Sequence, residues 1–184
     1  MTKHRILIPA DCGGQAVSKR PSPLDRYARN LRPGTVSWIG LRSGRRGDVV
    51  SVDTAMAIAE RGLDGDHRMD KTPGSGRQVT VISEEFIAAT AHFLGRDAID
   101  PQLLRRNIVV SGINLNGLRH QRFQVGEALL EATELCHPCS RMEEVLGVGG
   151  YAAMLGHGGL CARILVGGRI AIDDEVRVVF EVSA

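Results

Sequence analysis

The feature that most constrains the fold is a series of short apolar runs that begins at Thr35 and continues almost to the C-terminus. Runs of this length, rich in Val, Ile and Leu and bounded by turn residues, predict β-strands. The runs are TVSWIGL, DVVSVDT, RQVTVIS, NIVVSG, ALLEAT, LCARILV and EVRVVFEV. Because few helical segments separate them, the pattern favours a barrel or sandwich over a βαβ array. We therefore predict a mostly β protein with a few helices (α+β), built on a closed or partly open β-barrel.

Three segments between these runs carry helix signals. Residues 83–94 begin with a serine N-cap followed by two glutamates and end before a glycine, which is typical of a capped helix. Residues 101–105 follow an aspartate cap and start with a proline, a residue favoured in the first turn. Residues 140–146 form the third predicted helix, and a further helical turn is expected at 151–155.

The chain divides into an arm and one domain. Residues 1–33 are rich in Gly, Ser, Pro and charge without periodicity, and they predict an irregular N-terminal extension. Residues 34–184 have the length of one domain with an ordinary core. The sequence has no run of about 18 apolar residues for a membrane span, and its first apolar stretch is too brief for a secretory signal. We expect a cytoplasmic protein without a membrane partner.

The charge of the chain is balanced, but its cations are mostly one residue type. The formal net charge is only +2, which argues against sequence-independent nucleic-acid binding. Of the 23 basic residues, 20 are arginine and 3 are lysine. Guanidinium forks suit phosphate and carboxylate oxygens, although codon bias in a GC-rich genome would produce the same ratio. Only the placement of the arginines in the fold separates these two explanations.

The window LCHPCSRMEEVLGVGGYAAMLGHGGLCARILVGG holds three of the four cysteines, and its thiols have several possible roles. In a chain without an export signal, free thiols, a metal site or a redox pair are favoured over structural disulfides. Cys136, Cys139, His157 and Cys161 have spacings compatible with a structural zinc site. Cys136 and Cys139 also form a CxxC motif, but a thioredoxin-like redox protein needs a βαβ context that this sequence lacks.

A third role for the window is a single thiolate ligand to a soft metal, which leaves coordination positions open for a substrate. Pro138 stiffens the approach to Cys139, and Arg141 is close enough in sequence to lower the pKa of its thiol. The simpler alternative is that Cys139 is a small buried hydrophobic residue, the usual role of a free cysteine.

Two further segments carry candidate anion-binding residues. GLDGDHRMDKTPGSGRQVTVIS contains His67 among acidic residues, and it reaches Arg77 just before a strand; a solvated loop is the simpler interpretation. In LLRRNIVVSGINL, Arg105, Arg106 and Asn107 precede an apolar strand. Two arginines and an amide can bind a phosphate from two sides, but arginines at a helix C-terminus also serve the helix dipole.

Four stretches in register resemble the MOSC domain, named for the C-terminal domain of molybdenum cofactor sulfurases. They lie within residues 32–182 and are GLDGDHRMDKTPGSGRQVTVIS, RRNIVVSGINL, RFQVGEALLEATELCHPCSRME and GHGGLCARILVGGRI. The likeness is greatest to small stand-alone bacterial members. One departure is Asp173-Asp174, where the family commonly has Gly-Asp in a turn. The resemblance implies a β-barrel of MOSC type that binds the molybdenum cofactor (molybdopterin).

The resemblance also implies roles for individual residues. The family's central cysteine, which ligates molybdenum or carries sulfur, corresponds to Cys139. Arg105 and Asn107 correspond to residues that grip the pterin phosphate, and Thr133 to a threonine near the cofactor. Further candidate cofactor contacts are Arg163, Arg77 and His67.

These correspondences predict a molybdenum-dependent oxidoreductase that reduces N-hydroxylated compounds. Its electrons would come from a separate reductase or a ferredoxin-like protein, because the sequence has no flavin or iron–sulfur motif. Pyridoxal phosphate is not expected. The alternatives are a non-catalytic module that holds the cofactor or carries sulfur as a persulfide on Cys139, and, third, a structural zinc protein.

Overall fold

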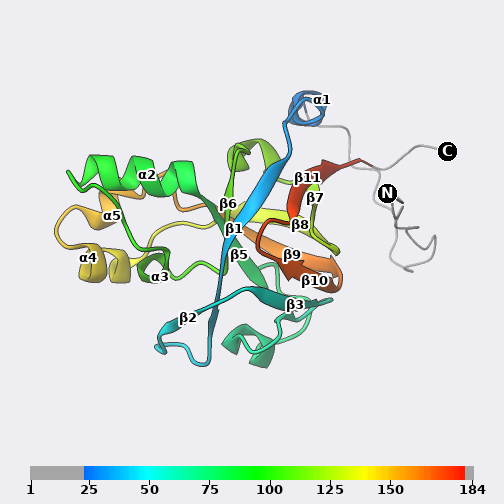
Figure 1. The fold of residues 1–184 in the computed structure, drawn as a ribbon, viewed down its shortest axis with the longest axis horizontal. Helices are drawn as coiled ribbons and strands as arrows, with labels where there is room; N and C mark the ends of the chain where they lie inside the picture. Colours follow the sequence, from blue (N-terminus) through cyan, green and yellow to red (C-terminus); the bar gives the residue numbers. More distant parts are fainter. Residues whose placement is uncertain (1–22, 181–184) are drawn as a thin grey trace.

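The computed structural model describes residues 23–180, and seven of its strands close into a β-barrel (Figure 1). Around the barrel, each strand pairs with the next in the order β1 (Gly34–Arg42), β11 (Glu175–Val179), β7 (Arg122–Val125), β8 (Ala128–Leu135), β9 (Leu160–Val166), β5 (Val79–Ser83) and β6 (Ile108–Ser111), and β6 returns to β1. The β5–β6 pair is parallel and the other six pairs are antiparallel. The predicted barrel is therefore confirmed.

The barrel interior is filled by aliphatic side chains. Alternate residues of each strand point inward, as in any pleated sheet with one buried face. The interior includes Val36, Val81, Val110, Leu130, Leu160 and Ile164, together with Phe123. On β9 the inward residues are Leu160, Ala162 and Ile164, so Cys161 and Arg163 lie on the outer face.

Four helices pack together at one side of the barrel and form a second core (Figure 1). They are α2 (Glu84–Phe93), α3 (Pro101–Leu104), α4 (Ser140–Leu146) and α5 (Gly150–Ala153). The Ser83 hydroxyl accepts from the Phe86 amide and Asp100 accepts from the Gln102 amide, so both predicted N-caps are confirmed. The second core contains Ile82, Ile87, Leu104, Val109, Met142, Leu146 and Met154.

A smaller sheet and one added strand complete the β structure. The sheet has the order β10 (Gly168–Ala171), β3 (Thr54–Ile58) and β4 (Gly62–Leu63), and β2 (Val49–Val52) extends the barrel sheet beside β1. The predicted strand DVVSVDT is thus two strands in different sheets, and β4, β7 and β10 were not predicted. In the turn before β11, Asp173 has φ 68°, so this aspartate takes the positive φ that the family's glycine would supply.

The described part of the N-terminal arm packs on the barrel. Residues Pro23–Ala28 form helix α1, so the prediction of an irregular arm is wrong for this segment. Ala28 is buried, the Gln121 amide donates to Asp25 (2.6 Å), and the Arg29 guanidinium lies 4.5 Å from the centre of the Phe180 ring. The predicted arm residues 1–22 lie outside the described residues.

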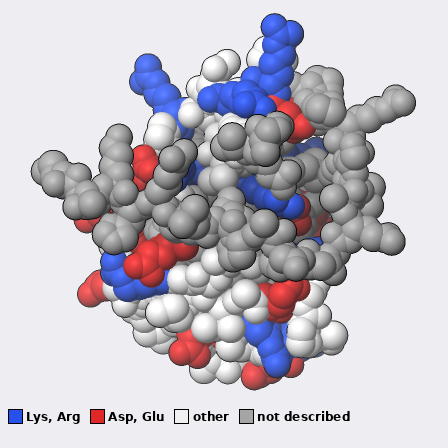
Figure 2. All heavy atoms as spheres, turned by 90° about the vertical axis from the view of Figure 1, so that its right-hand side faces the viewer, with Lys and Arg blue, Asp and Glu red and all other residues white. Residues whose placement is uncertain are grey.

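The surface near α1 and β11 carries mixed charge. On the part of this face formed by described residues, acidic and basic side chains are interspersed (Figure 2). Among residues 23–180, no helix is both long and apolar enough to cross a membrane.

Candidate functional site: a thiol beside an arginine cluster

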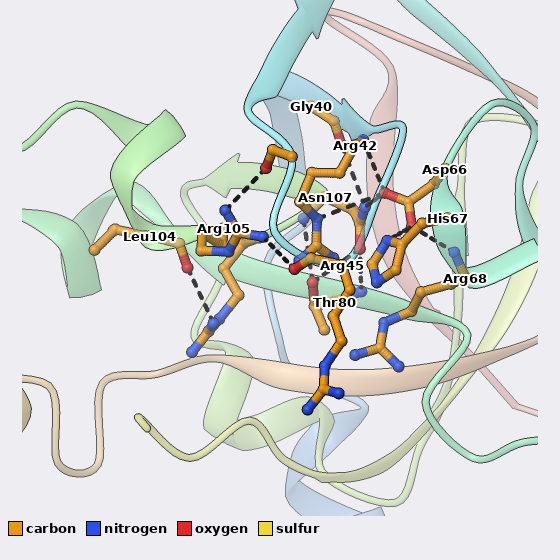
Figure 3. Close-up of polar contacts among 12 residues, drawn as sticks. Gly40, Arg42, Arg45, Asp66, His67, Arg68, Thr80, Leu104, Arg105 and Asn107 are labelled. Atoms are coloured by element: carbon orange, nitrogen blue, oxygen red, sulfur yellow. Dashed lines mark hydrogen bonds and ion pairs between the residues drawn. The ribbon is translucent and has the colours of Figure 1, made fainter. Parts of the chain in front are cut away.

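A buried hydrogen-bonded pair, Asp66 and Asn107, organises one end of the barrel (Figure 3). Asn107 is 1% exposed and Asp66 is 3% exposed. The Asn107 amide nitrogen donates to Asp66 Oδ2 (2.8 Å) and to the Gly40 carbonyl (3.2 Å). Its amide oxygen accepts from the backbone nitrogen (3.2 Å) and the hydroxyl (2.9 Å) of Thr80.

All the hydrogen-bonding capacity of the Asn107 amide is therefore used inside the protein. The resemblance assigns Asn107 to the pterin phosphate. In the structure its amide joins β1, β5 and the Asp66 loop, and its donors and acceptors already have protein partners. Its role at the site is to position its neighbours.

Arg105 lies at the C-cap of α3 with φ 57° and turns back toward the β1–β2 loop. Its guanidinium donates to the backbone carbonyls of Arg45 (2.9 Å) and Gly47 (3.1 Å). Burial and the charge of Arg141 lower the pKa of Arg105, whereas the nearby Cys139 sulfur opposes this lowering. The predicted pair Arg105 and Cys139 is therefore close enough to interact electrostatically.

Arg106, the neighbour that sequence reasoning passed over in favour of Arg105, is buried. Its guanidinium donates to three backbone carbonyls: Gly158 (2.7 Å), Leu104 (3.1 Å) and Cys136 (3.2 Å). This fork joins the end of α3 to the segments before α4 and β9. Arg106 thus holds the cysteine-bearing segment in place.

Six arginines gather around these groups, and we call them the arginine cluster: Arg42, Arg68, Arg77, Arg105, Arg106 and Arg141. Burial, with the charges of Arg105, Arg68 and Arg106, lowers the pKa of Arg42 to about 10 against the opposing effect of Asp66. The pKa of Arg68 is also lowered, first by burial and then by the Arg77 charge.

Some of the cluster's donors are unused. Among the described residues, the Nε atoms of Arg68 and Arg77 are buried and have no hydrogen-bond partner. Arg42 Nε is also buried without a hydrogen-bond partner, and it lies 3.7 Å from Asp66 Oδ2. Buried cations that repel one another and retain free donors are stabilised by an added anion, so the cluster suits an anionic ligand.

Cys139 presents its thiol at the edge of this cluster. It is exposed, directly precedes α4, and makes no side-chain hydrogen bond to the helix end. The interpretation of Cys139 as a small buried hydrophobic residue is therefore wrong. Cys139 interacts electrostatically with both Arg77 and Arg105, so three of the predicted site residues are brought together.

Cys136 and Cys161, in contrast, are buried and adjacent. The Cys161 thiol donates a hydrogen bond to the Cys136 sulfur, and Arg77 Nη2 donates to the same sulfur (3.3 Å). Hydrogen bonding with Cys161, together with the Arg106, Arg77 and Arg68 charges, lowers the pKa of Cys136 to about 5 against the effect of burial. The same contact raises the pKa of Cys161. Cys136 thus pairs with Cys161, outside the CxxC motif.

The zinc interpretation is not supported by the geometry. The His157 ring packs edge-on against Phe86 and Phe93, with ring centres 5.4 and 5.5 Å away, and its Nδ1 lies 3.0 Å from the Leu155 carbonyl oxygen. Among residues 23–180, no group of three or more His, Cys, Asp or Glu side chains is arranged to hold a metal ion.

Thr133 supports the loop before β5. Its hydroxyl donates to the Gly76 carbonyl (2.5 Å) and also lies within hydrogen-bond distance of the Cys161 carbonyl (3.1 Å), at a bulge in the β8–β9 ladder. The threonine therefore fixes the loop that carries Arg77, and its hydroxyl is occupied by protein groups.

The two other predicted site residues are His67 and Arg163. His67 Nδ1 is 3.0 Å from Asp66 Oδ1, and burial, with the Arg42 charge, lowers the pKa of His67. His67 is therefore part of the Asp66 group. Arg163 lies opposite Glu131 on β8, two residues beyond Cys161 on the same outer face of β9, and nothing in the structure joins its side chain to Cys139.

Sequence reasoning missed the cluster members Arg42 and Arg68 and the central role of Asp66. Arg42 ends the apolar run of β1, and Arg68 follows His67 in the loop that had been interpreted as solvated. The available signal was a charged residue at the end of an apolar strand, which requires a partner if it is buried.

These observations define a class of protein: a β-barrel with an exposed thiol beside an arginine cluster that suits an anion. Residues 67–177, more than half of the chain, match the MOSC domain family, and the chain belongs to that family. A search of curated protein sequences gave no match.

Solved structures share the fold. The YuaD protein from Bacillus subtilis has a TM-score of 0.68 at 18% identity, over 82% of this chain and 98% of that one. YiiM from Escherichia coli has a TM-score of 0.62 at 19% identity, over 82% and 72%. YiiM from Geobacillus stearothermophilus has a TM-score of 0.64 at 15% identity, over 80% and 75%. At these identities the likeness concerns the fold alone.

Proposed function

We propose that this chain binds the molybdenum cofactor at the arginine cluster, with Cys139 as the thiolate ligand of the metal, and reduces N-hydroxylated compounds. The observation that carries the proposal is an exposed thiol, free of side-chain hydrogen bonds at its helix end, beside arginines whose buried Nε atoms are unused donors. A phosphate-bearing pterin and a soft metal need this combination of an anion site and one sulfur ligand.

The residues present fit the group. Arg77 and Arg105 are the cluster members that have Cys139 as an electrostatic neighbour, so they would hold the anionic part of the cofactor. Asn107 and Arg106 would position these cations without touching the ligand. When bound, the cofactor supplies two-electron oxygen-atom transfer, and the protein supplies orientation and charge neutralisation.

The reaction needs reducing equivalents, and we assign their supply to a separate reductase or ferredoxin-like protein. The exposure of Cys139 supports this arrangement, because a site at the surface is open to substrates and to a docked donor. The substrates would be amidoximes, hydroxylamines or N-hydroxylated purines.

The test is elemental analysis of molybdenum and zinc, with pterin content, in the full chain from a host that makes the cofactor and from one that does not. We expect molybdenum near one per chain only from the first host. Arg105→Ala and Arg77→Ala should lower pterin content by about tenfold, the scale of a lost charge-assisted contact. The matched control is Arg119→Ala, an exposed arginine after helix η2 (Leu115–Leu118), which should load as the parent does.

Cys139→Ala separates the two thiol-dependent roles. Under the proposal it abolishes reduction of benzamidoxime by a supplied electron donor. A persulfide on Cys139 in a chain that carries no molybdenum, from a host that loads other molybdenum enzymes, would overturn the proposal in favour of sulfur delivery.

A further inference from the structure

A second thiol site lies behind the cluster. Cys136 is 1% exposed and Cys161 is 0% exposed. The Cys136 amide donates to the Gly159 carbonyl (2.8 Å), which continues the β8–β9 pairing beyond Leu135 and Leu160. This pairing places the two cysteines on the outer face of the same pair of chain segments, at diagonally adjacent positions of the ladder.

The surroundings of Cys136 favour its thiolate. Arg77 Nη2 donates to the sulfur at 3.3 Å, and the Arg106 and Arg68 charges act in the same direction. Cys161 stays protonated as the donor in this contact, and the nearby Glu134 carboxylate also favours its protonated form. A thiolate beside cations and next to a second thiol is the arrangement that oxidises most readily among cysteines.

We propose that Cys136 and Cys161 are a redox-active dithiol, distinct from Cys139, that hydrogen peroxide converts to a disulfide. The Cys136 thiolate attacks one peroxide oxygen, so that an S–O bond forms, the O–O bond breaks and hydroxide leaves. The Cys161 sulfur then attacks the sulfenic acid; the S–S bond forms, the S–O bond breaks, and a second hydroxide leaves and takes the Cys161 proton to form water. The two sulfurs lose two electrons in total, and the peroxide is reduced to one water and one hydroxide, which takes a proton from solvent and becomes the second water.

Burial selects the oxidant. Both sulfurs are enclosed, so the thiols of another protein have no approach to them, whereas peroxide is uncharged and close to water in size. Disulfide formation also removes the thiolate that Arg77 binds, which leaves that arginine with one more free donor. The inference is independent of the proposed cofactor.

The test uses the full chain carrying Cys12→Ser and Cys139→Ser, so that Cys136 and Cys161 are the only cysteines present. Brief treatment with hydrogen peroxide should lower the intact mass by about 2 Da, the loss of two hydrogens. The number of thiols titrated in denaturant should fall from two to none, and peptide mapping should find Cys136 joined to Cys161 within one chain.

Two further measurements make the result decisive. With Cys161→Ser added, and folding checked by circular dichroism, Cys136 should remain a sulfenic acid that dimedone captures. In the parent chain, peptide mapping should again join Cys136 to Cys161. A parent disulfide between Cys136 and Cys139 would overturn the proposal, and so would reduced Cys136 at peroxide concentrations that fully oxidise Cys139.

Discussion

Replacing Asn107 by alanine tests whether this residue is a structural link or a cofactor ligand. The substitution leaves the Asp66 carboxylate and the Gly40 carbonyl without a donor, and it leaves the Thr80 backbone nitrogen and hydroxyl without an acceptor. All four contacts are buried, so water does not simply replace the amide.

The size of the effect follows from these four contacts. Each neutral buried hydrogen bond contributes about 1 kcal/mol, and the bond to the ionised carboxylate about 2 kcal/mol. Their sum is about 5 kcal/mol, and a water that enters the space left by the amide restores part of it. We therefore expect the free energy of unfolding to fall by about 3–5 kcal/mol, a large share of the stability of a small domain.

The assay is equilibrium unfolding in urea, followed by circular dichroism and by the fluorescence of the single tryptophan, Trp38. The control is Asn116→Ala, an exposed asparagine in η2, which should change the unfolding free energy by less than about 0.5 kcal/mol. If Asn107→Ala unfolds within about 1 kcal/mol of the parent, the amide is not the structural link inferred here. Unchanged stability with lost pterin would instead make Asn107 a direct ligand.

Three further changes test other parts of the structure. Gly159→Ala should prevent stable folding, because the added Cβ would collide with the Val81 carbonyl. Gly156 also has positive φ but faces open space, so Gly156→Ala should lower the free energy of unfolding by only about 1 kcal/mol in a thermal or urea melt. The difference in unfolding free energy between the parent and Cys136→Ser, measured in reducing buffer, should rise by about 1 kcal/mol per pH unit from pH 6 to 8. The reason is that the pKa of Cys136 is about 5 in the folded state and 9.0 in the unfolded state. If this difference does not rise with pH, Cys136 is not a buried thiolate. Arg106→Lys should lower the free energy of unfolding by about 2 kcal/mol in the same assay, because an ammonium does not span three carbonyls.

Local signals were sufficient for the helices and for most of the barrel strands. The caps at Ser83 and Asp100 act through hydrogen bonds to residues two or three positions away, so a short window of sequence contains all the information. The same holds for β1, β5 and β9, because their aliphatic runs are long enough to predict a strand without knowledge of its partners.

Strands that depend on distant partners were not predicted. DVVSVDT divides at Asp53 because β2 pairs with β1 and β3 pairs with β10, more than a hundred residues further on. The segments of β4, β7 and β10 are short or polar, and tertiary pairing alone makes them strands.

The site divides in the same way. Cys139 and Arg105 were found by their motifs, and the structure brings them together. The hydrogen bonds of Asn107 were not predicted, because its partners Gly40 and Asp66 are 67 and 41 residues away. The partnership of Cys136 with Cys161 was missed because the CxxC spacing directed attention to Cys139.

The excess of arginine over lysine can now be attributed position by position. Codon bias accounts for an exposed residue such as Arg119, where either cation would serve. It does not account for Arg106, whose guanidinium joins three carbonyls, or for Arg105, which bridges two. It also does not explain why Arg68 and Arg77 lie half-buried next to each other with unused Nε donors, an arrangement that costs stability in the absence of an anion. A cost in stability of this kind is maintained where the arrangement has a function. Codon bias does not explain the unused donors of the arginine cluster, whereas an anionic ligand does.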